Sequence, residues 1–154
     1  MQSISMPPAF IPTQEPSGRI YLGNAQLNIL SDVKTLILFD AIDPNFTDGI
    51  EDVANHRILP GVAGYYYFSA SIVAQTISVA KDHTLHVARN PGAITIAQDS
   101  RHSGMNFNLA LAVSDVCYLA ANQWLDVYYM QHDSDNVDVL AYTNMSWLSV
   151  QRVR

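Results

Sequence analysis

Two histidines on one expected strand come nearest to a metal-binding pattern in this chain. His83 and His86 are three residues apart. Successive side chains of a strand point to opposite faces of a sheet, so residues three apart lie on opposite faces. The two imidazoles could therefore not bind one metal ion without a bend. We expect each of them to be an ordinary surface or hydrogen-bonded histidine, and we expect no metal site there.

Two acidic segments carry carboxylates at a density that calcium could use. Residues 40–52 contain five carboxylates and residues 133–138 contain three. Calcium takes roughly six to eight oxygen ligands, with acids at alternate positions and a glutamate at the twelfth in its best-known loop. Neither segment follows that spacing, so solvated turns explain both. Calcium binding and a glycosidase-like carboxylate pair stay as minor alternatives.

Enzyme signatures are scarce. The sequence contains no Gly-x-Ser-x-Gly elbow, no phosphate-binding glycine loop and no His-Glu-x-x-His zinc pattern. The one cysteine, Cys117, cannot form an internal disulfide and lies between Val116 and Tyr118. With no nearby cations to lower its pKa, we expect a small core residue rather than a reactive thiol. The chain is therefore expected not to be an enzyme and to need no cofactor.

Composition points to a surface that other protein covers. Of the 154 residues, 14% are charged and 49% are hydrophobic, whereas a lone soluble domain carries about 25% charged residues. The net charge of −6 and the eight scattered basic residues disfavour nucleic acid, which needs clustered Lys and Arg. No apolar run approaches the roughly 18 residues that span a bilayer. The first residues lack a basic flank and an apolar run, so we expect no secretory signal and assembly in a cytoplasm.

The N-terminal residues 1–17 form a segment apart from the rest. Proline at this density blocks helices and central strands and favours extended conformation. The segment is either a disordered leader or an arm that docks on a neighbouring protein, and we favour the docked arm. This predicts an arm over residues 1–17 and one domain over residues 18–154. The residues expected to dock are Pro7, Pro8, Phe10, Ile11 and Pro12.

From residue 18 the chain alternates short apolar segments with turn signals, the pattern of a β-sandwich or jelly roll. A helical period is considered only for Val73–Lys81. Turns are expected at Asp43-Pro44-Asn45, Asn90-Pro91-Gly92, Ala121-Asn122-Gln123 and residues 133–136. The expected strands are Arg19–Leu22, Gln26–Leu30, Thr35–Asp40, Gly64–Gln75, Thr84–Ala88, Ala93–Gln98, Met105–Leu119, Trp124–His132 and Asn144–Val153.

The expected strand that begins at Gly64 has bulky side chains on both faces. Tyr66, Phe68, Ala70 and Ile72 share one face, which can fill the core, while Tyr65, Tyr67, Ser69 and Ser71 share the other. Tyrosines on a second face need either a partner subunit or a second sheet of the same chain to cover them. In Met105–Leu119 a similar division puts Phe107, Leu109, Leu111 and Val113 on one face and the smaller Asn108, Ala110, Ala112 and Ser114 on the other.

Several motifs together resemble the globular head of complement 1q and its tumour-necrosis-factor relatives, from about residue 33 to the C-terminus. They are Leu38-Phe39-Asp40, Pro60, Gly64-x-Tyr66-x-Phe68-Ser69, Leu85-x-Val87-x-x-Asn90, Val116-x-x-Leu119, Leu125-x-Val127 and Met145-Ser146-Trp147-Leu148-Ser149-Val150. The chain has Asn122-Gln123 where the family usually has Gly-Asp, and Met145-Ser146-Trp147 where it usually has Phe-Ser-Gly. The resemblance implies a ten-stranded, all-β jelly roll that assembles as a homotrimer. It also implies that Tyr65, Tyr67, Ala110, Ala112, Met145 and Trp147 point toward the trimer axis.

Low charge, a proline-rich arm and a trimer-forming fold favour a structural role in a virus. We expect a trimeric decoration or cement protein at the capsid surface of a phage virion, with the arm on the major capsid protein or another virion protein. The alternative is a receptor- or carbohydrate-binding tip domain of a phage fibre, for which residues 1–32 look too short to be a stalk. Only Tyr128, Tyr129 and Tyr142 hint at such binding. An enzyme on a β-sandwich is the third hypothesis.

Overall fold

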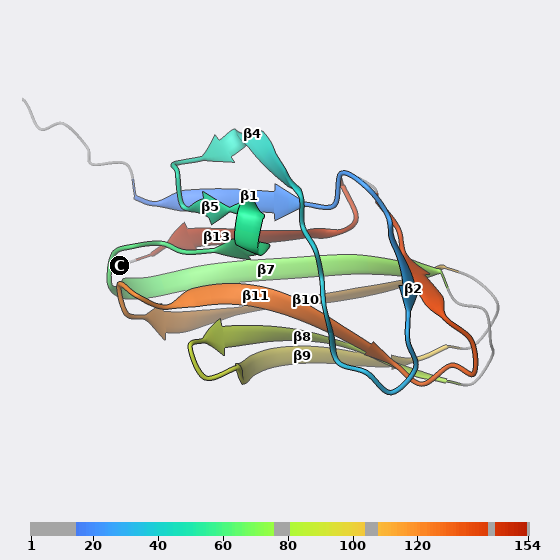
Figure 1. The fold of residues 1–154 in the computed structure, drawn as a ribbon. Helices are drawn as coiled ribbons and strands as arrows, with labels where there is room; N and C mark the ends of the chain where they lie inside the picture. Colours follow the sequence, from blue (N-terminus) through green and yellow to red (C-terminus); the bar gives the residue numbers. More distant parts are fainter. Residues whose placement is uncertain (1–14, 76–80, 104–107, 142–143, 154) are drawn as a thin grey trace, which may run out of the picture.

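The computed structural model describes residues 15–75, 81–103, 108–141 and 144–153. These residues form two antiparallel sheets that face one another (Figure 1), with one short 3-10 helix at Val53–Asn55. None of the described segments is a helix long and apolar enough to cross a membrane. The expected all-β jelly roll is confirmed.

The first sheet has seven strands in the order β2-β12-β7-β13-β1-β4. Strand β10 pairs with β7 along the edge opposite β13. Its strands are β1 (Ser17–Tyr21), β2 (Gln26–Ile29), β4 (Ala41–Thr47), β7 (Gly64–Gln75), β10 (Asn108–Leu119), β12 (Val137–Val139) and β13 (Trp147–Arg152). The β7–β10 pair runs the full length of both strands, from Asn108 opposite Gln75 to Leu119 opposite Gly64.

The second sheet has six strands in the order β5-β6-β11-β8-β9, with β3 also paired to β11. Its strands are β3 (Thr35–Leu36), β5 (Glu51–Asp52), β6 (Arg57–Ile58), β8 (Asp82–Asn90), β9 (Ile94–His102) and β11 (Trp124–Gln131). Strands β9 and β10 therefore lie at the same side of the sandwich, each at the edge of its own sheet (Figure 1).

The core lies between the two sheets and follows the period of two along each strand. Tyr66, Phe68, Ala70 and Ile72 of β7 are fully buried, as expected. The second sheet contributes Leu85, Val87, Leu125, Val127 and Tyr129 to the same cluster. The Tyr66 hydroxyl donates a hydrogen bond of 2.7 Å to the Val62 carbonyl oxygen, so this buried ring keeps its polar atom paired.

Several expectations about elements need correction. Asp43-Pro44-Asn45 is not a turn but lies inside β4, which is tolerated because β4 is an edge strand and proline needs no ladder partner there. The expected strand Thr35–Asp40 is a strand only over Thr35–Leu36. Strands β5, β6 and β12 fall where no strand was expected, and the described residues form thirteen strands where the resemblance implied ten. Of the possible helix at Val73–Lys81, residues 73–75 belong to β7 and residues 76–80 lie outside the described residues.

Candidate subunit interface

The outward face of β7, β10 and β13 carries no charged side chain within these three strands. The register places Tyr65 beside Tyr118, Tyr67 beside Val116 and Gln151, and Ser71 beside Ala112 and Trp147. We call this surface the uncharged face. Its residues are Tyr65, Tyr67, Ser69, Ser71, Ala110, Ala112, Ser114, Val116, Tyr118, Trp147, Ser149 and Gln151.

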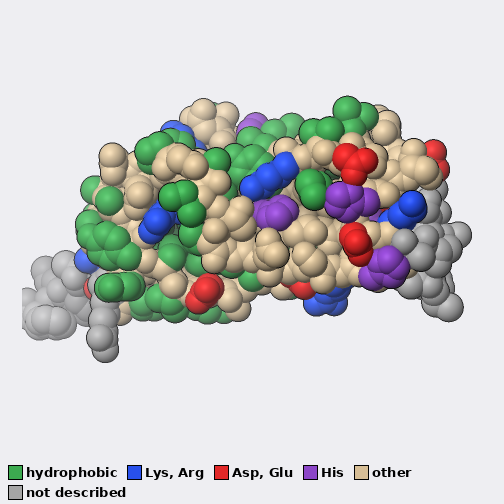
Figure 2. All heavy atoms as spheres, turned by 90° about the horizontal axis from the view of Figure 1, so that it is seen from below, with side chains coloured by type: hydrophobic (Ala, Val, Ile, Leu, Met, Phe, Trp, Pro, Cys, Tyr) green, Lys and Arg blue, Asp and Glu red, His purple; other side chains and the backbone are tan. Residues whose placement is uncertain are grey.

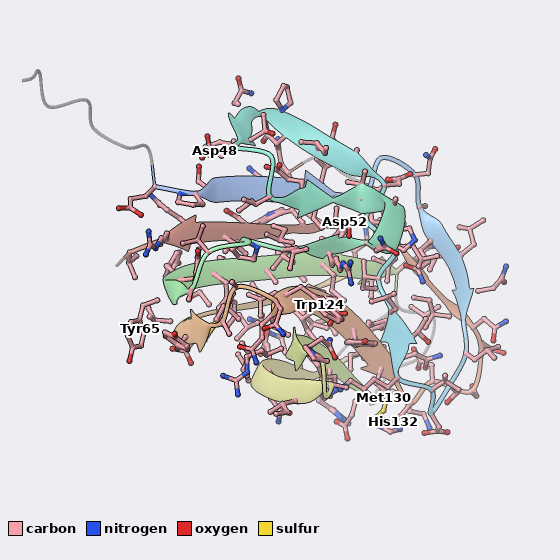
Figure 3. The ribbon with its side chains drawn as sticks, turned by 60° about the vertical axis from the view of Figure 1, so that its left-hand side comes forward. Asp48, Asp52, Tyr65, Trp124, Met130 and His132 are labelled. Carbon is pink, nitrogen blue, oxygen red and sulfur yellow. The ribbon has the colours of Figure 1, made fainter. Side chains whose placement is uncertain are left out.

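One end of the uncharged face is an aromatic cluster. Tyr65 and Tyr67 are 52% and 44% exposed, and Val116 and Tyr118 are 50% and 47% exposed. The rings of Tyr65 and Tyr118 meet edge to face, with centroids 5.4 Å apart and an interplanar angle of 70°. Figure 3 shows Tyr65 at one end of the sandwich. The alternative that a second sheet of the same chain covers Tyr65 and Tyr67 is therefore wrong.

The middle of the uncharged face is built from small side chains. Ala110 and Ala112 are exposed and lie opposite Val73 and Ser71 of β7. Side chains of this size let another backbone approach closely, while the neighbouring tyrosines supply bulk. The structure thus brings four of the six expected interface residues, Tyr65, Tyr67, Ala110 and Ala112, onto two adjacent strands.

The remaining two expected residues lie toward the other end of the face. Met145 precedes β13 and is 46% exposed. Trp147 is only partly exposed, because the Arg19 guanidinium lies 4.6 Å from the centre of its ring. Arg19 is in turn 3.6 Å from the Asp43 carboxylate. One face of the Trp147 ring is thus already covered by a cation of its own chain.

Sequence reasoning missed two members of the aromatic cluster. Val116 and Tyr118 are separated from Ala110 and Ala112 by even numbers of residues along β10, so all four side chains point to the same face. The alternation of a strand could therefore have predicted them. The expected arm residues Pro7, Pro8, Phe10, Ile11 and Pro12 lie outside the described residues. The described chain enters β1 at Ser17, held by a 2.9 Å hydrogen bond from the Arg152 amide to the Pro16 carbonyl oxygen.

The described outward face of the second sheet lacks an exposed aromatic cluster like that of Tyr65, Tyr67 and Tyr118, because Trp124 and Tyr128 both lie beneath cations. Arg57 lies 4.4 Å from the Trp124 ring centre and Lys34 lies 4.9 Å from that of Tyr128. Arg57 also pairs with Asp52 at 2.7 Å. Tyr129 is buried, and Tyr142 lies outside the described residues. Of the three tyrosines that hinted at receptor or glycan binding, only Tyr128 is described and partly exposed.

A chain of polar groups inside the sandwich has the composition of a catalytic relay. The Tyr129 hydroxyl lies 2.6 Å from His83 Nδ1, and His83 Nε2 lies 3.5 Å from Asp133 Oδ2. All three residues are buried, and burial lowers the pKa of His83. A relay needs a substrate in reach of its nucleophile, and this one is sealed. His83 is thus a hydrogen-bonded histidine, as expected.

His86 lies on the opposite face of β8 from His83, as its spacing predicts. Both of its ring nitrogens are enclosed without a hydrogen-bond partner among the described residues, so the expectation of a surface or hydrogen-bonded histidine is wrong for His86. Burial lowers the pKa of His86, and the nearby Lys34 acts in the same direction. Burial likewise raises the pKa of the Cys117 thiol to about 11, so Cys117 stays protonated at neutral pH, as a partly buried core neighbour should.

Carboxylates of the first acidic segment, residues 40–52, have separate partners. Asp40 accepts from the Gly23 amide, and Asp48 accepts from the Ser17 amide and hydroxyl. Asp52 pairs with Arg57 (Figure 3 labels Asp48 and Asp52). Within the described ranges, no three His, Cys, Asp or Glu side chains are grouped so that they could hold a metal ion. These residues tie loops to the sandwich.

Comparison with known proteins shows likeness in structure and none in sequence. No family model and no curated protein matches the chain. An Eiger TNF from S. frugiperda superposes with a TM-score of 0.69 at 10% identity, covering 92% of this chain and 94% of that one. The globular domain of zebrafish complement 1qA protein gives 0.65 at 9% identity, covering 92% and 98%. Murine APRIL at pH 5.0 gives 0.70 at 10% identity, covering 91% and 100%.

Structural similarity at these low sequence identities shows a shared fold and does not show a shared function. The two facing sheets, the long β7–β10 pair and near-complete coverage of all three structures agree on one architecture. The resemblance seen in the sequence motifs is thereby confirmed at the level of the fold. The chain folds as a jelly roll of the complement-1q and tumour-necrosis-factor type.

Proposed function

We propose that this chain is a non-enzymatic structural protein that functions as a homotrimer joined through its uncharged face. One observation carries the proposal: twelve outward positions on three neighbouring strands hold no charge, although the chain has a net charge of −6. Depletion of charge with enrichment of tyrosine is typical of the centre of a protein–protein interface. A second copy of the chain is the partner that this face fits.

The aromatic cluster supplies the driving force for that association. A tyrosine buries about 150–250 Å² when fully enclosed, so a half-exposed ring leaves roughly 100 Å² to cover. At about 25 cal/mol per Å², each ring contributes a gross ~2–3 kcal/mol before the costs of association. Tyr65, Tyr67 and Tyr118 are three such rings. A stable interface needs about 800 Å² from each partner, which the alanines and serines beside the rings would complete.

The finer proposal is that the trimer is a decoration or cement protein on a phage capsid, placed at the virion surface. A trimer matches the local threefold axes of an icosahedral shell, and low overall charge suits a chain whose surface is covered by neighbours. The proline-rich residues 1–17 would dock on the major capsid protein or another virion protein. The fibre-tip alternative has less support, because Tyr129 is buried and Tyr128 lies beneath Lys34.

Size-exclusion chromatography with light scattering tests the assembly. The expected mass is three times the 17.0 kDa of one chain. Tyr67→Glu should give a folded monomer, because Tyr67 is half exposed and a carboxylate there is desolvated only in the assembly. Gln98→Glu, at an exposed position on the outward face of the other sheet, is the matched substitution that should leave the mass unchanged. A native wild-type monomer at micromolar concentration would remove the proposal.

Co-sedimentation tests the capsid role separately. Purified protein mixed with phage shells that lack it should pellet with the shells and raise their resistance to heat or chelation. Binding to host cells with no binding to shells would instead support the fibre-tip alternative. A trimer that binds neither shells nor host cells would support the proposed assembly but would contradict both the capsid role and the fibre-tip role.

A further inference from the structure

A cleft of about 240 Å³ opens where β1 ends, between the turn that leads to β2 and the segment that leads into β4. Its apolar wall consists of Leu22, Ala25 and Leu38. Leu22 is buried and forms the base of this wall, whereas Leu38 is 43% exposed and forms its rim. Sites for drug-sized molecules measure about 300–1,000 Å³, so this cleft fits a smaller group such as one side chain.

The cleft lies away from the uncharged face. None of the residues that line it belongs to β7, β10 or β13. Strand β1 begins with Ser17 paired to Gln151, beside the aromatic cluster, and ends with Tyr21 paired to Trp147. Figure 2 shows that the two ends of the molecule differ, with hydrophobic side chains gathered toward one and histidine and carboxylate side chains toward the other. A trimer joined through the uncharged face therefore does not use the residues of the cleft.

One carboxylate, that of Asp40, lines the cleft and is exposed. Its Oδ1 accepts a hydrogen bond of 2.5 Å from the Gly23 amide, and its Oδ2 accepts one of 2.8 Å from the Asn24 side-chain amide. Both donors are uncharged, so they hold the carboxylate in place without neutralising it. Burial acts to raise the pKa of Asp40, but the hydrogen bonds from Asn24 and Gly23 outweigh it and lower that pKa. Asp40 is therefore a fixed negative charge at neutral pH, with lone pairs left for a further donor.

Two further polar side chains line the cleft, and their hydrogen bonds show what each can still offer. His56 Nδ1 lies 2.9 Å from the Phe39 carbonyl oxygen. A carbonyl can only accept, so we assign the proton to Nδ1, which leaves Nε2 of the neutral ring as an acceptor. Gln26 donates to the Leu36 carbonyl oxygen and accepts from the Leu38 amide, both at 2.9 Å. The cleft thus combines an aliphatic wall, a fixed negative charge and a second acceptor.

We propose that this cleft binds the side chain of a lysine from a partner protein. The four-carbon stem lies along Leu22, Ala25 and Leu38, and the ammonium group donates to Asp40. Each Asp40 oxygen already accepts one hydrogen bond, which disfavours the planar, two-pronged pairing that an arginine makes with a carboxylate. A compact ammonium group with three donors can use the remaining lone pairs of Asp40 and Nε2 of His56.

The lysine belongs to another protein for three reasons. Leu38 and Asp40 are both exposed, so a free amine would stay largely in water, whereas a partner surface closes the mouth of the cleft. This chain has two lysines, of which Lys34 already covers the Tyr128 ring and Lys81 is only partly exposed. The net charge of −6 attracts a basic partner. The proposal requires neither the trimer nor the capsid role.

Titration of the full-length, nitrogen-15-labelled protein with blocked lysine (Nα-acetyl-lysine methylamide) tests the site by NMR. The backbone amide signals of Gly23, Leu38 and His56 should shift together, and those of β7 and β10 should not. The dissociation constant should lie in the millimolar range, because a single side chain has few atoms. Blocked norleucine has the same stem without the ammonium group and should bind roughly threefold more weakly, or less. No shift at about 20 mM blocked lysine, or equal affinity for blocked norleucine, overturns the proposal.

Two variants separate the charge from the aliphatic wall. Asp40→Asn removes the charge but keeps an acceptor for the Gly23 amide, so it should abolish the preference for blocked lysine over blocked norleucine. Leu38→Ala shortens an exposed side chain and should weaken the binding of both probes. Asp135→Asn, at an exposed position outside the cleft, makes the same change in net charge and should leave the affinity unchanged. An undiminished preference for lysine in Asp40→Asn, or tighter binding of blocked arginine than of blocked lysine, overturns the proposal.

Discussion

Asp99 Oδ2 accepts a hydrogen bond of 3.0 Å from the backbone amide of Ala112, and so joins the edge of one sheet to the edge of the other. Asp99 belongs to β9 and Ala112 to β10, and the two strands are not paired by a ladder. An unpaired edge is a template for unwanted strand addition. The carboxylate of Asp99 satisfies an amide of that edge and places a charge beside it, with Arg101 Nε 2.9 Å away.

Asp99→Ala should therefore destabilise the domain and expose the edge of β10. The loss of a hydrogen bond to a charged group costs about 1–3 kcal/mol of unfolding free energy. Urea unfolding measures the loss, and light scattering measures any new aggregation. Gln98→Ala, one residue earlier and exposed on β9, is the control and should change the midpoint little. Equal midpoints for the two variants would mean that the Asp99–Ala112 contact does not hold the edge.

Ala112→Arg should block association without unfolding the subunit. Ala112 is exposed in the single chain, so the larger side chain has room there. In the proposed trimer the long arginine side chain would clash with a small-residue surface, and its charge would be removed from water even beside the Asp99 carboxylate, which costs several kcal/mol. Sedimentation velocity should show the mass fall to one chain while the circular dichroism stays that of a β protein. A trimer that tolerates Ala112→Arg would place the interface elsewhere.

The fold could be predicted where one face of a strand is buried and the period of two is unbroken. Strand β7 was predicted with its observed bounds, because Tyr66, Phe68, Ala70 and Ile72 mark its inner face. Its partner β10 follows from the same pattern at Leu111. Part of the uncharged face could be predicted for the same reason. Once the inward residues of a strand are known, the residues between them must point outward.

The remaining features depend on contacts that a local pattern does not contain. Strand β4 has mostly exposed side chains and a proline, so its sequence resembles a turn, and only pairing with β1 makes it a strand. Arg19 covers the ring of Trp147, although the two residues are far apart in the sequence. The same is true of the Tyr129–His83–Asp133 chain, for which the sequence gives no signal beyond the residue types.

Strong acid should weaken the domain through its two surface aspartates. Hydrogen bonds from His132 and His102 lower the pKa of Asp32 and Asp82 below the ordinary value of 3.8. A carboxyl with a lowered folded pKa contributes stability that is present above pH 3.8 and lost as pH falls through the folded pKa. Asp32→Asn and Asp82→Asn should each flatten the fall in melting temperature between pH 4 and pH 2. If the melting temperature of both variants falls with pH as steeply as that of the wild type, other carboxyl groups cause the loss of stability in acid.

Removal of residues 2–14 should separate assembly from attachment. The cut spares Glu15, whose carboxylate lies 3.2 Å from Arg152 Nη1, and Pro16, whose carbonyl accepts from the Arg152 amide. Strand β1 should therefore keep its place and the truncated chain should still form the trimer. If Pro7, Pro8, Phe10, Ile11 and Pro12 anchor the trimer to a shell, the truncated protein should no longer pellet with particles.

Phe10→Asp in the full-length chain is the single-site version and should weaken pelleting at least tenfold. Undiminished pelleting of both proteins would assign the attachment to the jelly roll itself.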